Sequence, residues 1–278
     1  MITALVISIL AILFLILKTY AFKRSYLIEV RKGYFRTSKS ASESLTENDI
    51  AHLPAQVQKY LRYVGVIGKE KVVNVRILFN GVMQDKNKRQ FRIKAEQTSF
   101  FDVPTRLFYL KGIMMGLPIK ALHKYINAHA AFEVKPLSLF HIVNEKEGNL
   151  NIAETVTFFN DMCLFAPATL IDPAIKWEKA GNNTVKATFT CNGITVTSNL
   201  VFNEEGQLVN FWSDDRYYLN KENKMQRMRW TTPAKNYKDY NGYLLASYAE
   251  AIWSFPEGDY CYARFDLREV VYNSGINE

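Results

Sequence analysis

The hydrophobic pattern divides the chain into three parts. An unbroken apolar run, Ile2–Leu17, opens the sequence and continues almost to Phe22. Residues 33–49 are rich in Ser, Thr and charge, which is typical of a linker. From Val72 onward, short segments alternate apolar and polar residues, as half-buried strands do. We therefore expect a transmembrane anchor at 1–22, a basic juxtamembrane segment and linker at 23–49, and a β-rich globular domain at 50–275.

The alternating segments are separated by turn signals with short loops, which favour antiparallel pairing. The segments are 73–79, 91–95, 106–111, 119–126, 131–143, 184–191, 195–202, 208–212, 225–230, 242–248 and 260–272. The turn signals are Asn80-Gly81, Gly181-Asn182, Asn192-Gly193, Glu205-Gly206, Asn241-Gly242 and Glu257-Gly258. So many strands must curl or close. We predict an α+β, mainly β fold, in which an N-terminal transmembrane helix precedes a large curled antiparallel sheet, half-barrel-like, with one or two packed helices.

Two segments have helical rather than strand periodicity. Between Pro54 and Gly65, apolar residues recur on one helical face, and the two flanking residues suit its start and stop. The second helix runs from Asn151, a candidate cap paired with Glu154, to about Phe165. Its apolar face is wide, which suits a helix pressed into a curved sheet.

Cys163 lies in this second helix, two residues after Asp161, and raises the question of a nucleophile. Residues two apart on a helix point about 200° apart, so the pair cannot act as a local dyad. A reactive cysteine also needs an electropositive, partly exposed setting, and the pattern offers none. We expect Cys163 to be a core residue, whereas Glu154, Thr157 and Asp161 share the narrow polar side of the helix.

The net charge of +8 is concentrated next to the apolar run. Residues 1–46 carry +5 and the remaining 232 residues only +3. A nearly neutral domain argues against a nucleic-acid partner, which requires a basic patch on the domain itself. A basic flank C-terminal to the apolar run predicts a single-pass membrane protein with a cytoplasmic domain. A cleaved signal peptide, with a site at Thr19-Tyr20-Ala21, stays open as the alternative.

Candidate chemistry is sparse. The sequence has no HExxH, CxxC, GxSxG, GxGxxG or P-loop motif. His123 and His129 are six residues apart in an expected strand, so they would share a face. They could bind one metal ion together if a carboxylate joined them. Histidines on strands more often face solvent or have hydrogen-bond partners for their ring nitrogens, so we expect no metal and no cofactor. Asp214 and Arg216 share a strand face and are expected to pair, unless Arg216 points into a cavity and holds an anionic head group.

Several separated motifs resemble an uncharacterised family of bacterial membrane-anchored proteins that carry a domain of unknown function. They include LPAQVQKYL, NDMCLFAPATLID, SDDRYY and FPEGDYCYARF, and the resemblance covers roughly residues 50–273. Such sequences look like the lipoprotein-carrier (Lol-type) half-barrel, a curled antiparallel sheet with an apolar cavity. The resemblance implies no catalytic residue, and it implies an extracytoplasmic domain as the alternative to the cytoplasmic one.

We predict a non-enzymatic domain that binds a lipid or other apolar molecule in its concave sheet. The prediction rests on the anchor, the long antiparallel pattern and the aromatic content. The candidate ligand-binding residues are Phe158, Met162, Phe165, Arg216, Trp230 and Trp253. Two alternatives stay open. One is an enzyme of unrecognised type using carboxylates such as Glu154, Asp215 or Glu250, and the other is a protein-interaction module. The oligomeric state does not follow from the sequence.

Overall fold

The computed structural model describes residues 2–38, 43–85, 87–220, 222 and 224–275. The helices in these ranges are α1 (Ile2–Thr37), α2 (Glu47–Ile50), α3 (Ala55–Val64), α4 (Asn149–Phe165) and the 3-10 helix η1 (Pro167–Ile171). The strands of the first part are β1 (Asn74–Gln84), β2 (Gln90–Phe100), β3 (Thr105–Met114), β4 (Leu117–Ile126), β5 (His129–Pro136) and β6 (Val143–Lys146). Those of the second part are β7 (Ile175–Lys179), β8 (Thr184–Cys191), β9 (Ile194–Phe202), β10 (Leu208–Ser213), β11 (Tyr217–Leu219), β12 (Met225–Arg227), β13 (Arg229–Thr231), β14 (Ala234–Tyr240), β15 (Tyr243–Phe255) and β16 (Gly258–Tyr272).

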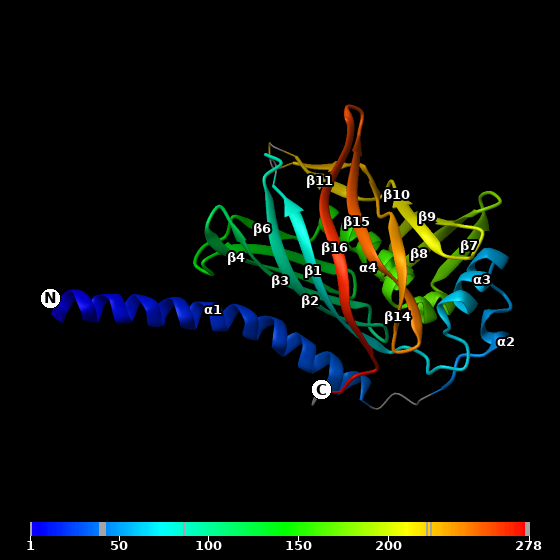
Figure 1. Cartoon of the computed structure of the whole chain (residues 1–278), viewed down its shortest axis with the longest axis horizontal. Coiled ribbons are helices and arrows are strands. Elements are labelled where there is room, and N and C mark those ends of the chain that lie inside the picture. Colours follow the sequence, from blue (N-terminus) through cyan, green and yellow to red (C-terminus); the bar gives the residue numbers. More distant parts are fainter. Residues whose placement is uncertain (1, 39–42, 86, 221, 223, 276–278) are drawn as a thin grey trace.

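Most strands form one strongly curved antiparallel sheet. Its order is β6-β5-β4-β3-β2-β1-β16-β15-β13-β10-β9-β8-β7, with β14 added on β15. The last strand of the chain, β16, pairs with the first, β1, and so joins an N-terminal meander to a C-terminal half. Because β6 and β7 remain as edges, the sheet is open. The curled, mainly antiparallel β fold expected from the sequence is confirmed (Figure 1).

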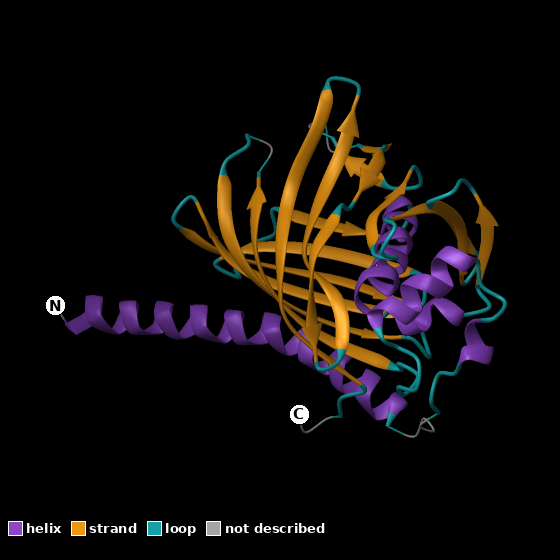
Figure 2. Ribbon diagram, turned by 45° about the vertical axis from the view of Figure 1, so that its right-hand side comes forward, coloured by secondary structure: helices purple, strands orange, loops and turns teal. Residues whose placement is uncertain are grey.

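Helix α4 lies inside the curve, where both halves of the sheet pack around it (Figure 2). Its side chains are buried almost all round, which explains the wide apolar face seen in the sequence. Cys163 is completely buried, as expected of a core residue, and burial raises the pKa of its thiol well above the ordinary value. Helix α3 covers the adjacent end of the core, where the Tyr60 hydroxyl donates a hydrogen bond to the Cys163 carbonyl oxygen (2.7 Å).

Helix α1 uses its C-terminal half to cover the outer face of the sheet. Four buried residues spaced four apart form the contact surface: Phe22, Tyr26, Val30 and Tyr34. They pack on Phe100, Leu107, Tyr109 and Leu122 of β2, β3 and β4. This contact explains why the first six residues of β3 are buried on both faces, with Leu107 and Tyr109 under α1.

The N-terminal half of α1 extends beyond the sheet (Figures 1 and 2). Its described apolar side chains, which include Leu10, Phe14 and Leu17, are exposed. Within the part of the chain that the structure describes, no helix holds a stretch long and apolar enough to cross a bilayer. The predicted anchor at 1–22 therefore stays a prediction. The helix continues without a break past residue 22 to Thr37, and so includes the first residues assigned to the linker; residues 39–42 of that linker lie outside the described residues.

Several local predictions were wrong for identifiable reasons. Asn80-Gly81 is not a turn but lies within β1, where a Cβ on Gly81 would come within 2.6 Å of the Arg264 carbonyl oxygen. Asn151 is not a cap. It lies in the first turn of α4, and its side-chain oxygen accepts a hydrogen bond from the Ala130 amide (2.7 Å). The expected strand 131–143 is divided between β5 and β6, and β7, β11 and β14 were not predicted.

The docking of α1 depends on Gly33, because a Cβ there would lie 2.2 Å from the Phe100 ring, which is fully buried. We expect Gly33→Ala to loosen α1 at a cost of about 1–3 kcal/mol, as overpacking does. Trypsin should then cut faster at Arg31, Lys32 and Arg36. Gly181→Ala is the matched control, since its nearest neighbour would be 3.9 Å away. Equal trypsin rates for both variants would contradict the tight contact.

Candidate functional site

A cavity of about 630 Å³ lies on the concave side of the sheet, next to α4. Its walls come from both halves of the sheet, and the tip of the β1–β2 hairpin and strand β11 border it as well. The volume lies in the range of sites for small organic ligands. The predicted curled sheet thus encloses a partly open cavity rather than a solid core.

The walls are mainly aromatic and aliphatic. Phe79 is central among them, because its ring contacts those of Phe108, Phe165 and Phe265 at 5.3–6.5 Å between centroids. Polar residues gather mainly at two places, apart from single carboxylates at Glu145 and Glu250. One is the hairpin tip, with Gln84, Asp85, Asn87 and Arg89, and the other is the surface of α4. A ligand would therefore meet an apolar passage with a polar floor.

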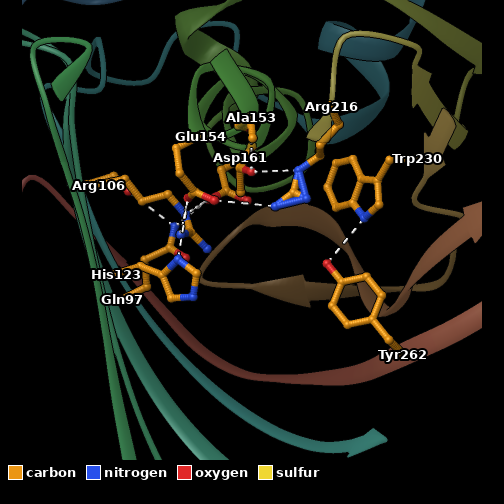
Figure 3. A network of polar contacts seen from close by, with 11 residues as sticks. Gln97, Arg106, His123, Ala153, Glu154, Asp161, Arg216, Trp230 and Tyr262 are labelled. Atoms are coloured by element: carbon orange, nitrogen blue, oxygen red, sulfur yellow. Dashed lines mark hydrogen bonds and ion pairs between the residues drawn. The ribbon is translucent and has the colours of Figure 1, made fainter. Parts of the chain in front are cut away.

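The floor is a network of buried charged side chains (Figure 3). Glu154 of α4 lies between two arginines and accepts hydrogen bonds from Arg106 Nη1 and Arg216 Nη2, both at 3.4 Å. Arg106 belongs to β3, whereas Arg216 directly precedes β11. All three side chains are at most 10% exposed. The network thus connects the helix to both halves of the sheet.

A second carboxylate completes the network. Asp161, two turns further along α4, accepts hydrogen bonds from Arg106 Nε (2.6 Å) and Gln97 Nε2 (2.8 Å). Arg216 also donates from Nε to the Thr157 hydroxyl (3.2 Å). The polar side of the helix predicted from the sequence, Glu154 with Thr157 and Asp161, therefore faces the cavity and holds both arginines.

The two carboxylates differ in their electrostatics. Burial raises the pKa of Asp161, and its contacts with Arg106 and Gln97 offset this only in part. Burial acts in the same direction on Glu154, but His123 and the two guanidinium groups outweigh it and lower the pKa of that carboxyl. Of these partners, the permanently charged arginines are the ones that keep Glu154 ionised. Glu154 is therefore a fixed negative charge between two positive ones.

His123 of β4 is the remaining polar group beside this network. Its Nδ1 is buried 3.7 Å from Glu154 Oε2, and it has no hydrogen-bond partner among the described residues. The ring stacks on Phe132 at 3.7 Å between centroids. Desolvation lowers the pKa of His123, although Glu154 opposes this shift. The floor thus holds a neutral imidazole whose Nδ1 is buried beside Glu154.

Arg216 is also enclosed by aromatic rings. Its Cζ lies 4.3 Å from the ring centroid of Trp230 and 5.4 Å from that of Trp253. The Trp230 Nε1 in turn donates to the Tyr262 hydroxyl (3.2 Å), which also borders the cavity (Figure 3). Such packing orients a guanidinium group without neutralising it. The free edge of Arg216 is therefore held in place on the cavity side.

Four of the six candidate ligand residues line the cavity: Phe165, Arg216, Trp230 and Trp253. The other two lie elsewhere on α4. Phe158 packs against Phe101, Tyr125 and Phe189, and Met162 is buried in the same core. The helix thus presents its polar stripe to the cavity and most of its apolar surface to the core. A ligand-binding role for these residues stays a prediction.

The expected ion pair between Asp214 and Arg216 is wrong. Asp214 instead accepts both hydrogen bonds of Arg229, and the neighbouring Asp215 pairs with Arg227. The alternative geometry, with Arg216 in a cavity, is the one observed. Of the carboxylates considered for an enzyme, Glu154 and Glu250 border the cavity and Asp215 does not.

The sequence did not predict three of the cavity residues, Arg106, Gln97 and His123. A usable signal lay on α4, where Glu154, Thr157 and Asp161 form one stripe on an otherwise apolar helix. A buried helix with an ionisable stripe requires partners of opposite charge. Which strands supply them depends on long-range pairing, and no local pattern marks Arg106 as such a partner.

The predicted common face of His123 and His129 is wrong as well. A turn at Asn127 and Ala128 separates β4 from β5, so that His129 opens the next strand and pairs with Ile126. Among the described residues, no group of three His, Cys, Asp or Glu side chains is arranged to hold a metal ion.

Comparison with known proteins gives a family and a set of similar structures. The model of a family of unknown function (DUF6544) matches residues 43–265. No curated protein gives a significant match. A DUF1329 family protein from Desulfovibrio piger is 11% identical, with a TM-score of 0.45 over 80% of this chain and 93% of that one. A LolA superfamily protein from Nitrosomonas europaea is 9% identical, with a TM-score of 0.39 over 81% and 96%. At these values the resemblance to Lol-type carriers stays a prediction.

The buried network predicts a specific loss of stability on Glu154→Gln. Removing one charge leaves two buried guanidinium groups without their shared partner, at a cost of about 3–5 kcal/mol. The control is Glu178→Gln, because Glu178 pairs with Lys186 on the surface and its loss should cost less than about 1 kcal/mol. Urea unfolding measures both, and similar values for the two variants would contradict the role of the network.

The same variant should change the response to acid. The pKa of Glu154 is lower in the folded chain than its ordinary value of 4.5, so the unfolded chain takes up this proton first. The stabilisation by Glu154 is then complete above about pH 4.5 and falls as the pH drops further. Between pH 5 and 3, the wild-type protein should lose more stability than Glu154→Gln; parallel curves would show that Glu154 is not a fixed charge.

Proposed function

Because the chain belongs to a family of unknown function (DUF6544), we propose its function from the site itself: the domain binds an amphipathic, lipid-like molecule in the cavity under the curved sheet. The observation that carries this proposal is the distribution of polarity in the cavity. Its walls are mainly aromatic and aliphatic, and its buried charged groups, Arg106, Glu154, Asp161 and Arg216, are gathered on the floor at α4. An acyl chain along the walls with its head group on the floor satisfies both parts.

The arginines determine which head group fits. Each has guanidinium hydrogens beyond those used by Glu154, Asp161 and Thr157, since a guanidinium offers five. A carboxylate or phosphate head group would accept hydrogen bonds from Arg216 and Arg106 without requiring the network to break. The acyl chain would then point towards Met83 and Phe91, near the tip of the β1–β2 hairpin.

The proposal includes a membrane tether. The exposed apolar side chains on the free half of α1, such as Leu10, Phe14 and Leu17, favour insertion into a bilayer over exposure to water. The basic residues that follow favour a cytoplasmic domain by the positive-inside rule. A tether keeps the cavity close to a source of lipid, whichever side of the membrane the domain occupies.

An enzyme is the second candidate, because carboxylates do converge on the cavity. Glu154 is poorly suited to proton transfer, since two arginines hold it ionised. Asp161, whose pKa is raised, is the better candidate acid or base, but Arg106 and Gln97 both bind its Oδ2. We therefore favour a binding function, with turnover of a bound ester as the observation that would support an enzyme.

Filling the cavity should abolish ligand uptake. Ala121 of β4 lines the cavity, whereas Ala131 on the neighbouring strand lies beside Phe132, which faces it. We expect delipidated wild-type protein and Ala131→Phe to bind dansylundecanoic acid, and Ala121→Phe to bind it at least about tenfold more weakly, since the new ring occupies part of the site. Circular dichroism verifies folding. Unchanged binding by Ala121→Phe, or none by the wild-type protein, would contradict the proposal.

The head-group assignment predicts a selective effect of Arg216→Gln. Loss of a charge-assisted hydrogen bond should weaken binding of a carboxylate-headed probe about tenfold or more. The corresponding long-chain alcohol should bind wild-type and variant protein with similar affinity. Arg229→Gln, which removes an arginine paired with Asp214 outside the cavity, is the control. An equal loss for the acid and the alcohol would show that Arg216 shapes the cavity without holding the head group.

A further inference from the structure

The outer face of the sheet carries a row of lysines that the sequence alone does not reveal. Lys94 of β2 is directly opposite Lys111 of β3, Lys111 is opposite Lys120 of β4, and Lys120 is opposite Lys135 of β5. These residues are distant in the sequence and are aligned only by the register of the strands. We call this row the lysine ladder.

Like charges on directly opposite residues destabilise a sheet. Lys135 is partly compensated by Glu133 at 2.8 Å. For Lys94, Lys111 and Lys120, the described part of the chain provides no ion-pair partner. The pKa of Lys120 is lowered, first by desolvation and then by repulsion from Lys111 and from Lys23 of α1. The ladder is therefore a local excess of positive charge on a domain that is nearly neutral overall.

Exposed apolar side chains lie next to the ladder. The β3–β4 turn presents Ile113, Met115 and Leu117 with exposures of 63%, 69% and 48%. The β5–β6 loop adds Leu139, Phe140 and Ile142, which are also exposed. Ile113 and Pro118 share a groove on this outer face with Lys111 and Lys120. Lysines beside protruding apolar turns are the combination that suits the head-group region of a membrane.

Helix α1 relates this surface to the proposed tether. The hydroxyls of Thr19 and Ser138 are 3.4 Å apart, so the β5–β6 loop lies level with residue 19 of the helix. Close by, the Lys135 ammonium lies 4.5 Å from the ring centroid of Phe22. Beyond this point, the free half of α1 leaves the sheet (Figure 1). If the apolar half of α1 enters a bilayer, the two turns and the lysine ladder reach its surface.

We infer that this face of the domain, the lysine ladder with the β3–β4 and β5–β6 turns, docks on an anionic phospholipid bilayer. The lysines would contact lipid phosphates while the apolar turns insert among the head groups. Met114, Ile119, Ile142 and Val143 also border the cavity, so its rim lies beside the docked surface. The inference rests on the proposed tether for the distance to the membrane, but not on the ligand in the cavity. A nucleic acid, the other polyanion, would have no use for the apolar turns.

Hydrogen exchange of full-length protein in vesicles tests this surface separately from insertion of α1. One vesicle type is phosphatidylcholine alone, and the other contains about 30% phosphatidylglycerol, chosen for its surface potential. Both offer the same apolar interior to α1 and differ in surface charge. We expect exchange in residues 111–120 to slow about fivefold or more in the anionic vesicles, and the effect to vanish in high salt. Equal exchange in both vesicle types would overturn the inference.

Two paired variants make the result specific. Lys111→Gln with Lys120→Gln should remove the protection while leaving the cavity ligand bound, and should not destabilise the fold, because it relieves repulsion. Lys176→Gln with Lys186→Gln, on β7 and β8, should leave the protection intact. Retained protection in the ladder variant, or the same protection produced by a DNA oligonucleotide in detergent, would overturn the assignment to a membrane. Loss of ligand binding alone would refute the proposed function and leave this surface untouched.

Discussion

The architecture depends on one buried carboxylate held between two arginines. Glu154 lies on the helix inside the curve, Arg106 on the N-terminal half of the sheet and Arg216 on the C-terminal half. None of these groups can be moved to a dry interior alone without a large desolvation cost. Together with Asp161 they balance two positive with two negative charges. This balance fixes where the helix lies relative to both halves of the sheet, and therefore where the sheet stays open.

The cavity follows from this arrangement. Since α4 turns its charged stripe away from its packed faces, the concave sheet above that stripe is not filled by helix side chains. Aromatic residues of β1, β3 and β16 line the space instead, and Phe79 joins their rings. Buried ion pairs rarely maximise stability, and apolar replacements often stabilise a fold more. We therefore relate the charged floor beneath an apolar passage to the proposed ligand binding rather than to stability.

The sequence was sufficient where local chemistry decides the structure. Asn192-Gly193 and Asn241-Gly242 adopt positive φ and form the predicted hairpin turns, and Gly65 ends α3 in the left-handed conformation. It was insufficient where distant segments meet. The closure of β1 on β16, the contact of Arg106 with Glu154 and the alignment of Lys94 with Lys111 all depend on register, which no short pattern encodes. The net charge of the domain is near neutral and gives no sign of the basic face, because strand register alone aligns its lysines.

Photo-crosslinking with two fatty acids tests most directly whether the cavity holds an amphiphile with its head on α4. One probe carries a diazirine near the carboxylate and the other carries it at the end of the chain. We expect the first probe to label peptides of α4, within Asn149–Phe165, and the second to label the β1–β2 hairpin. Labelling confined to the outer face of the sheet, or the same peptides labelled by both probes, would contradict it.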